Sequence, residues 1–309
     1  MRKVAVVTTG FFDGVHLGHR HVLETVVSAA RERGEEAIVV TFWPHPRTVL
    51  QQDAREFRLL TSLEEKKALL TAFGIDRVEV LPFTRQFASL KAEEYLQLLR
   101  DRFGASLVVM GYDNRIGADR KMAREISVTS TRKPDLVLLG PILPGTSTGK
   151  PDLVREVAIS STQIRHALEE GRIEEANGML GYEYGLYGVV VAGNRMGRTM
   201  GFPTANMHLY EPLKLVPGNG VYAVEVEVLG ATYKGMCNIG KRPTVGGTTR
   251  TIETHILDFD QDIYGLPMRL RFLRRIRDER KFPSLEALRA QLMEDREQTL
   301  SVLCGQPTL

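Results

Sequence analysis

Helical patterns of apolar residues alternate with short continuous apolar runs along the first half of the chain. The helical patterns lie at residues 22–30 and 91–103, and Ser62 with Glu65 forms a capping box ahead of a helix at 66–73. Short apolar runs of the kind that form buried strands occur at residues 4–7, 37–42, 77–81, 107–110 and 136–139. This alternation predicts a parallel sheet covered by helices, with ligands at the carboxyl ends of the strands.

The pattern changes near residue 183. Before that point, residues 164–180 indicate two short helices around Gly171. After it, helical patterns disappear for a long stretch, and strands are expected at residues 186–191, 221–229, 233–239, 252–257 and 268–276. Short strands separated by glycine turns at this density predict an antiparallel barrel.

A final helical pattern begins after Ser284 and runs to about residue 304. Leu285, Leu288 and Leu292 share one face of it, which we expect to pack against the barrel. The predicted fold class is therefore α/β plus β. A Rossmann-like domain over residues 1–182 precedes a small antiparallel β-barrel domain with a C-terminal helix over residues 183–309.

Composition limits the partners. The 309 residues include 41 basic and 38 acidic side chains, a net charge of +3, which makes no case for a nucleic-acid or membrane partner. Cys237 and Cys304 are too few for a disulfide framework or a cysteine metal site, and both fit buried free thiols in a reducing compartment. The N-terminal apolar run lacks a cleavage site, and no run approaches membrane-spanning length. We expect a soluble cytoplasmic protein, whose oligomeric state the sequence leaves open.

Residues 10–19, GFFDGVHLGH, join the first strand to the first helix. A helix N-terminus offers unpaired N–H groups and a partial positive charge, and the glycines let a phosphate approach the backbone. His16 and His19 lie three residues apart, on one face, where both imidazoles can donate hydrogen bonds to phosphate oxygens. Either histidine alone would more simply be a structural residue, but the pair in this setting predicts a phosphate site.

Two further segments carry polar groups suited to nucleotide binding. His45 lies in TFWPHPRTVL, residues 41–50, which alone fits a rigid proline turn equally well. ISSTQIR, residues 159–165, opens a helix with three hydroxyl side chains, and Arg165 follows one turn later on the same face. Helix capping by the hydroxyls is the alternative to phosphate binding.

Together these segments resemble a known family. The string GFFDGVHLGHR resembles the HxGH nucleotidylyltransferase superfamily, and more closely the adenylyltransferase half of the bifunctional bacterial riboflavin kinase/FAD synthetases. Residues 41–50 resemble that family's TFxPHPR loop near the nucleotide and the flavin, and residues 159–165 its SSTxIR motif, which helps to bind the ATP triphosphate. The resemblance implies catalytic roles for His16, His19 and Arg165, and flavin binding by His45 and Asp113. It also implies ATP binding by Gly10, Phe11, Asp13, Gly14, Gly18, Ser160, Ser161 and Thr162.

One segment departs from the family pattern. Where the family commonly has GxDFxFG, residues 111–117 place Asn114 and Ile116 at the aromatic positions, although Asp113 and Gly117 remain. Asn and Ile cannot stack on a flavin as Phe can. An alternative is therefore a riboflavin kinase whose N-terminal domain is an inactive or altered nucleotide-binding module. A more distant alternative is a flavin-binding regulator.

Residues 193–206, GNRMGRTMGFPTAN, combine a glycine loop with a polar turn. Alone they would be a hairpin loop, although Thr204 and Asn206 offer oxygens suited to Mg²⁺. With NIGKRPTV, ETHILDFDQDIYG and RDERKFPSLEALRAQ further on, this half resembles riboflavin kinase from end to end. The resemblance implies that Thr204 and Asn206 ligate Mg²⁺ on the ATP phosphates and that Glu253 takes the proton of the ribityl 5′-hydroxyl; alone, Glu253 would be a solvated strand residue. The ATP-binding residues implied here are Gly193, Gly197, Arg198, Gly201 and Pro203.

The expected function is sequential synthesis of FMN from riboflavin and of FAD from FMN, each step using one ATP with Mg²⁺. In the second step the FMN phosphate attacks the α-phosphate of ATP and expels pyrophosphate. The attacking group is already an anion, so the site has to neutralise charge and align the reactants rather than supply a base. The expected partners are small molecules only: riboflavin, FMN and ATP.

Overall fold

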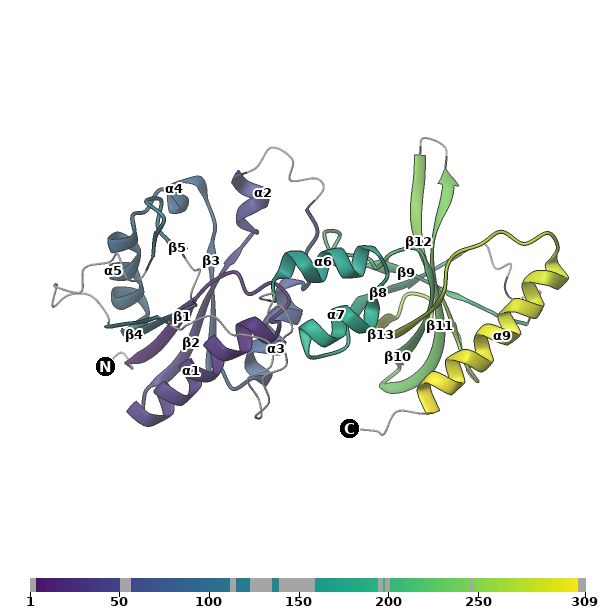
Figure 1. Ribbon diagram of the computed structural model, residues 1–309, viewed down its shortest axis with the longest axis horizontal. Helices are drawn as coiled ribbons and strands as arrows, with labels where there is room; N and C mark the ends of the chain where they lie inside the picture. Colours follow the sequence, from purple (N-terminus) through teal and green to yellow (C-terminus); the bar gives the residue numbers. More distant parts are fainter. Residues whose placement is uncertain are drawn as a thin grey trace, which may run out of the picture. The chain divides into compact units, whose positions relative to one another are not determined.

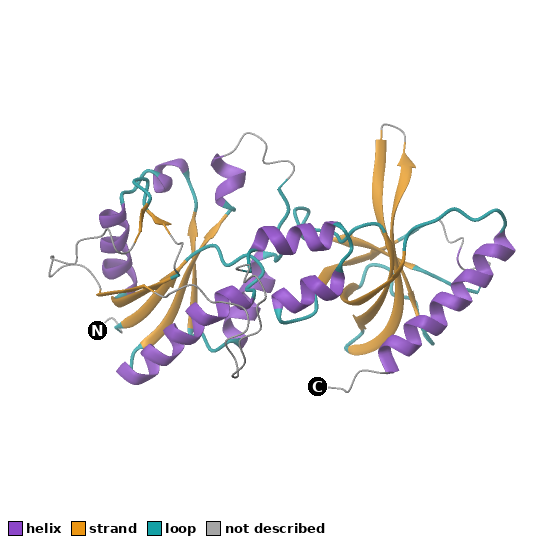
Figure 2. Cartoon of the chain, in the orientation of Figure 1, coloured by secondary structure: helices purple, strands orange, loops and turns teal. Residues whose placement is uncertain are grey.

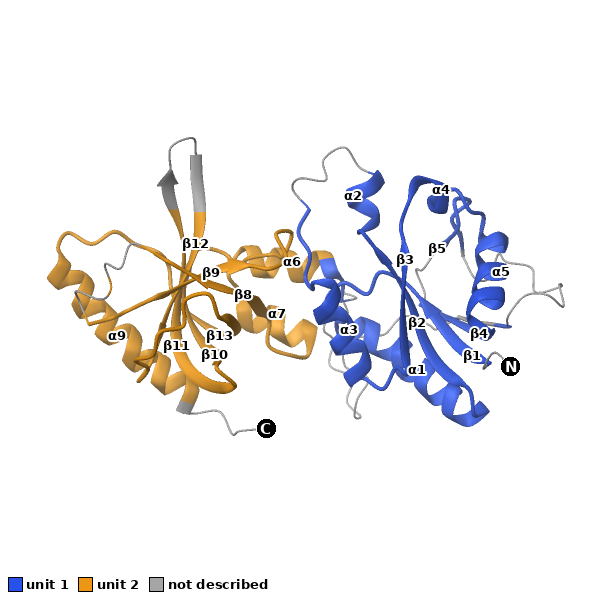
Figure 3. Cartoon of the chain, turned by 180° about the vertical axis from the view of Figure 1, so that it is seen from behind, with its two compact units in different colours: residues 1–161 blue, residues 162–309 orange. Residues whose placement is uncertain are grey.

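The computed structural model describes residues 4–50, 57–111, 115–122, 135–138, 159–193, 197, 201–244 and 247–304. Contacts divide the chain into two compact units, residues 1–161 and residues 162–309 (Figure 3). The two helices on either side of Gly171 therefore group with the barrel. The domain boundary predicted at 182/183 stays a prediction.

Unit 1 is built on a parallel sheet, as the sequence predicts (Figure 1). Its strands lie in the order β3-β2-β1-β4-β7, and every adjacent pair is parallel. The bounds are Ala5–Thr9 for β1, Glu36–Trp43 for β2, Arg77–Pro82 for β3, Ala105–Met110 for β4 and Asp135–Leu138 for β7. The strand order reverses direction between β1 and β4, and ligands bind at such switch points in open α/β sheets.

Helices cover both faces of this sheet because its strands are apolar on both sides. Val6 packs in one cluster with α1 (Leu17–Arg33) and α3 (Leu63–Ala72), whereas Val7 packs in another with α5 (Ala92–Phe103). The buried residues of α1 are those that the helical pattern indicated, namely Val22, Leu23, Val26, Val27 and Ala30.

The capping box ahead of α3 is confirmed. The N–H of Glu65 donates to Ser62 Oγ at 3.2 Å, and the N–H of Ser62 donates to Glu65 Oε2 at 2.7 Å. The sequence did not predict four short elements of this unit. They are α2 (Pro46–Leu50), α4 (Arg85–Ala88) and the hairpin of β5 (Arg115–Ile116) and β6 (Lys121–Met122).

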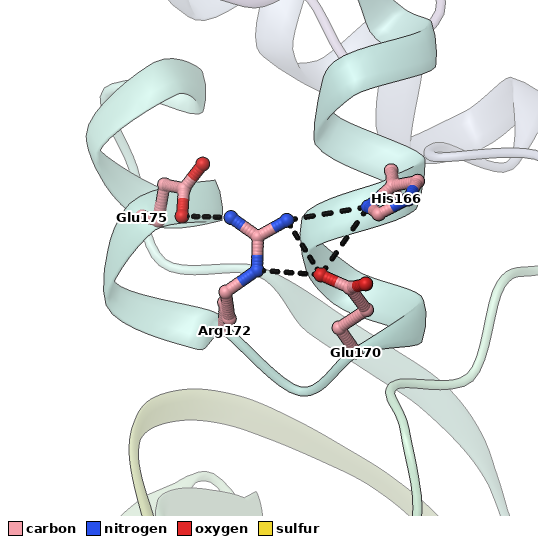
Figure 4. Close-up of polar contacts among 4 residues, drawn as sticks. All are labelled: His166, Glu170, Arg172 and Glu175. Atoms are coloured by element: carbon pink, nitrogen blue, oxygen red, sulfur yellow. Dashed lines mark hydrogen bonds and ion pairs between the residues drawn. The ribbon is translucent and has the colours of Figure 1, made fainter.

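Two short helices lead into the barrel, as predicted around Gly171. α6 spans Ser161–Glu169 and α7 spans Ile173–Leu180. Arg172, between them, pairs with Glu170 at 2.7 Å and with Glu175, and His166 contacts both Arg172 and Glu170 (Figure 4). These side chains are exposed, so the network orders the corner while contributing little free energy.

Unit 2 is a closed antiparallel barrel, which confirms the prediction (Figure 2). The strand order is β10-β11-β12-β9-β8-β13. The bounds are Gly185–Val191 for β8, Ala205–Leu209 for β9, Gly220–Val228 for β10, Ala231–Thr244 for β11, Gly247–Ile256 for β12 and Pro267–Arg277 for β13. The sequence did not predict β9, because it follows directly on the glycine loop and carries polar residues.

The C-terminal helix α9, Leu285–Cys304, begins as predicted, with the N–H of Ala287 donating to Ser284 Oγ at 3.2 Å. The predicted leucine face is wrong at its start, because Leu285 is 60% exposed. The fully or nearly buried positions are instead the polar residues Gln291, Asp295 and Thr299. Leu292 packs, partly buried, against a small cluster of barrel residues.

Asp295 explains why this helix face is polar. Its side chain is fully buried and forms a two-pronged pair with Arg277 of β13, at 2.8 Å from Nε and 2.7 Å from Nη2. Gln291 also donates to it at 2.8 Å. This geometry is the strong form of a charged hydrogen bond, and it fixes α9 to the barrel.

Cys237 is a buried free thiol, and burial raises its pKa to about 12; the side chain of Cys304 lies outside the described residues. None of the helices in the described ranges is both long and apolar enough to cross a bilayer.

We expect Asp295→Ala to lower the free energy of unfolding of unit 2 by about 3 kcal/mol, because it leaves Arg277 without its buried partner. Native-state hydrogen exchange of the β10 and β13 amides would measure the loss. The control is Glu294→Ala, which removes an exposed carboxylate one residue away and should change exchange little. Equal exchange in the two variants would contradict the role of the pair.

Candidate active sites

The loop after β1 is anchored by a buried carboxylate. Asp13 is 4% exposed and accepts hydrogen bonds from the N–H of Leu60 and the N–H of Thr61, each at 3.1 Å. The Thr61 hydroxyl donates to the same carboxylate at 3.2 Å and accepts from the N–H of Gly14 at 3.2 Å. The side chain predicted to bind ATP thus holds the loop against the segment before α3.

The backbone of this loop is unusual. Phe12, Gly14 and Val15 have φ values of 50°, 82° and 38°. Such left-handed conformations are costly for Phe and Val and persist only where neighbouring contacts impose them. Ser161, from the predicted hydroxyl motif, donates from Oγ to the carbonyl oxygen of Asp13 at 3.0 Å. The structure therefore brings the Ser161 hydroxyl to the loop after β1.

The two histidines of the loop lie together at the start of α1. Their rings stack with centroids 3.7 Å apart and an interplanar angle of 18°. Gly18 lies between them, and a Cβ there would come within 3.1 Å of the His16 ring and 3.2 Å of the Ile159 carbonyl oxygen. A side chain at the centre of HxGH would therefore press on the His16 ring, and glycine avoids this contact.

His19 is held neutral. Burial is the first cause that lowers its pKa well below the usual value, followed by the charges of His16 and Lys66. Its Nδ1 is buried and finds no hydrogen-bond partner among the described residues. A bound anion favours the protonated ring, so a phosphate at this place would supply both a partner and a counter-charge.

Three aromatic rings lie in a row beside the loop, in edge-on and tilted contacts. The ring of Phe11 lies 3.7 Å from that of His45, which lies 4.2 Å from that of Phe57. The ammonium of Lys66 lies 3.5 Å from the Phe11 ring centroid. Sequence reasoning found His45 but missed Lys66 and Phe57. The available signal for Lys66 was its spacing, because it shares the apolar face of α3 with Leu70.

Other predicted residues of the first site are placed less completely. Ile116 is 5% exposed and belongs to the core under α5, so its side chain is a packing residue. Asp113 and Asn114 lie outside the described residues. Thr162 and Arg165 lie on α6 within unit 2, so their relation to the loop stays a prediction.

The second candidate site lies on the barrel wall. The register of β9 and β12 places Asn206 directly opposite Glu253, and the register of β11 and β12 places Asn238 on the other side of Glu253. Opposed residues of antiparallel strands point to the same face, with Cβ atoms about 5 Å apart. Two residues 47 positions apart in the chain thus become neighbours, as their predicted shared role requires.

Gly193 lies against the Asn206 amide. A Cβ on Gly193 would lie 2.1 Å from Asn206 Nδ2, so any side chain there would displace the Asn206 amide. Further along, the N–H of Phe202 donates to the Gly197 carbonyl at 2.9 Å, and the Pro203 carbonyl contacts His255 Nδ1 at 2.8 Å. Gly201 has a φ of 82°, and Arg198 lies outside the described residues.

A pocket opens beside Thr204. Its walls come from β8, from the segment around Pro203, from β12 and from residues 259–264. The residues that line it are Val190, Pro203, Thr204, Ala205, Thr254, Ile256, Phe259, Asp260, Gln261, Asp262, Ile263 and Tyr264. The lining is mixed, because Asp260, Gln261 and Asp262 face the same pocket as Val190, Ile256 and Ile263.

The titration of His19 gives a direct test of the first site. We expect its imidazole to remain neutral at pH 6, and inorganic pyrophosphate to move its titration to higher pH, because an anion stabilises the charged ring. Histidine NMR, with the resonance assigned by loss in His19→Gln, would measure both. A titration near the ordinary value of about 6.5, unmoved by pyrophosphate, would contradict this description.

Known proteins resemble the chain over both units. A family model for FAD synthetase matches residues 1–136, and one for riboflavin kinase matches residues 180–303. The bifunctional riboflavin kinase/FMN adenylyltransferase of Bacillus subtilis is 36% identical, covering 96% of this chain and 92% of that protein. The protein of the same description from Escherichia coli K12 is 38% identical, covering 94% of this chain and 90% of its own.

A solved structure extends the similarity to the fold. The crystal structure of a protein described as a macrolide-efflux protein from Streptococcus pneumoniae covers 97% of this chain with a TM-score of 0.87 and 34% identity. The match includes 94% of that protein. With both family models in this order and relatives similar over nearly the whole length, the chain belongs to the family of bifunctional riboflavin kinase/FMN adenylyltransferases.

Proposed function

We propose that the glycine loop of unit 1 is the place of FMN adenylylation and that the barrel wall around Asn206 and Glu253 is the place of riboflavin phosphorylation. The pairing of Asn206 with Glu253 across β9 and β12 is the observation that carries the kinase assignment. The stacked histidines at the start of α1 carry the other. The alternative of a kinase with an inactive first domain is not favoured, because both family models match.

In the kinase step, the ribityl 5′-hydroxyl oxygen attacks the γ-phosphorus of ATP, the bond to the bridging oxygen breaks, and ADP leaves. Glu253 accepts the hydroxyl proton, since a carboxylate beside the attacking oxygen is the base that such transfers use. Asn206 holds its place because the Gly193 backbone packs against its amide. On β9 and β12 the pocket beside Thr204 is lined by Ala205 and Thr254, which are the chain neighbours of Asn206 and Glu253.

The residues here suit a magnesium ion bound mainly through phosphate oxygens. Asn206 and Thr204 would provide the protein oxygens, and Mg²⁺ commonly takes only one or two protein ligands in phosphate sites. Among the described residues no group of three or more His, Cys, Asp or Glu side chains is arranged for a metal. When bound, the ion would neutralise charge on the phosphates.

In the adenylyl transfer, an FMN phosphate oxygen attacks the α-phosphorus of ATP, the bond between the α- and β-phosphates breaks, and pyrophosphate leaves. His16 and His19 would donate hydrogen bonds to phosphate oxygens, and Gly14 and Gly18 keep the backbone open to them. His45 would contribute an aromatic wall beside Phe11. We assign Asp13 an indirect part, through the shape of the loop that it anchors.

Two further assignments rest on indirect support. We propose a boundary between the catalytic domains near 182/183, because the riboflavin kinase match begins at residue 180. We propose a cytoplasmic location, because the described cysteine is a free thiol and both steps use ATP.

A chromatographic time course with riboflavin, ATP and Mg²⁺ tests the function, with a parallel reaction that starts from FMN. We expect FMN to appear first and then to give way to FAD. FMN that accumulates without conversion in both reactions would refute the adenylyltransferase assignment.

Two substitutions should separate the activities. His19→Gln should reduce FAD formation from FMN by about 10²- to 10³-fold, because it removes a charge-stabilising donor, and leave FMN formation intact. Glu253→Gln should reduce FMN formation by about 10²- to 10⁴-fold, because it removes the base, and leave FAD formation from FMN intact. Each variant controls for the folding of the other, and a loss of both activities in either one would contradict separate sites.

Asn206→Ala tests the metal assignment. The kinase reaction should need a higher Mg²⁺ concentration for half-maximal rate, because one protein ligand is lost, whereas the Mg²⁺ dependence of FAD formation from FMN should not change. Kinase rates over a magnesium titration measure this. A lower rate at every concentration with the same half-maximal Mg²⁺ would argue against Asn206 as a ligand.

A further inference from the structure

Lys66 is a buried cation that the proposed chemistry does not yet use. Its side chain is fully buried on α3, and its Nζ finds no hydrogen-bond partner in the described part of the chain. Ammonium groups are seldom buried without partners, because losing hydration is costly. Each such group in a native protein therefore calls for an explanation.

Packing does not supply that explanation. Leu70 lies four residues later on the same buried face of α3, where an apolar side chain of similar length would fill the position. Burial lowers the pKa of Lys66 to about 8, although the Asp13 carboxylate acts to raise it. The group is thus protonated at neutral pH, and a charge is retained at the expense of stability.

The ammonium of Lys66 lies beside the loop after β1. Its Nζ lies 3.5 Å from the centroid of the Phe11 ring, and the Phe11 ring in turn contacts the ring of His45 edge-on. The charged and titratable groups that interact with it are Asp13 and His19. A cation over an aromatic face in a dry site contributes about 2 kcal/mol, enough to fix the ring.

We propose that Lys66 is a positioning residue of the adenylyltransferase site, which holds the Phe11 wall and places a positive charge under the loop where phosphate groups bind. This inference rests on the proposed function of unit 1. The charge acts through a low-dielectric interior, so it favours an anion at His16 and His19 without contacting it. While the site is empty, the same charge helps to keep His19 neutral.

The test compares Lys66→Met with Lys67→Met, which removes the neighbouring, partly exposed lysine that pairs with Glu64. We expect Lys66→Met to lower kcat/KM for ATP in FAD formation from FMN by about 10- to 100-fold, while FMN formation by the same preparation is unchanged. Lys67→Met should leave both activities unchanged. Lys66→Met activity within twofold of the original protein, or an equal loss in both variants, would overturn the proposal.

Stability provides a second readout, which a purely structural role would move in the opposite direction. Trp43, the one tryptophan of the chain, lies in β2, so its fluorescence follows the unfolding of unit 1 in urea. Lys66→Met should keep or raise the urea midpoint, because the cost of burying the charge exceeds the about 2 kcal/mol gained from its contact with the Phe11 ring. A lower midpoint together with the activity loss would assign Lys66 to structure and overturn the proposal.

The pH profile supplies a third readout. The kcat/KM of the original protein for ATP should fall as pH rises above about 8, because Lys66 then loses its proton, and Lys66→Met should lack that fall. The same alkaline fall in Lys66→Met would overturn the role of the charge. If the original protein forms no FAD from FMN, or if His19→Gln retains FAD formation, the proposed function of unit 1 fails instead.

Discussion

The Asp13 carboxylate is the interaction on which unit 1 depends most. It gathers the N–H groups of Leu60 and Thr61, so a loop at the end of β1 is tied to a segment 47 residues away. A carboxylate that accepts several backbone hydrogen bonds is a strong anchor. With that anchor in place, Phe12 and Val15 are held in left-handed conformations. His16 and His19 come directly after these residues in the chain, so the position of their stacked rings depends on the Asp13 anchor.

The two proposed sites bring their side chains together in different ways. In unit 1, the parallel sheet brings one strand end and one helix start together, so His16 and His19 are close neighbours in the chain. In unit 2, antiparallel register makes neighbours of Asn206 and Glu253, which no local pattern connects. Both sites use glycine for the same physical reason, since Gly18 and Gly193 leave room that a Cβ would fill. The side chains that they accommodate are the ones proposed to act.

Sequence patterns predicted the elements with strong periodicity and missed those whose burial is set by distant contacts. α1 buries the residues that its spacing indicated, and the parallel sheet and the barrel were both foreseen. β9 was missed because it is short and follows directly on a glycine-rich segment, although Ala205, Met207 and Leu209 alternate with polar residues. The face of α9 was misjudged because Arg277, on another element, makes Asp295 a buried residue. Lys66 was missed for a similar reason, since a lysine in a charged helix start is ordinarily solvated.

These features place several energetic costs around one loop. Phe12 and Val15 have unfavourable backbone conformations, His19 Nδ1 is buried without a described partner, and Lys66 is a buried charge. In such a site the hydrogen-bond donors are oriented before the substrate binds. Electrostatic stabilisation of a phosphate requires this preorganisation. A bound anion would then relieve part of these energetic costs, by giving His19 an acceptor and Lys66 a counter-charge. ATP should accordingly stabilise unit 1 against unfolding, because binding to the folded state alone shifts the unfolding equilibrium.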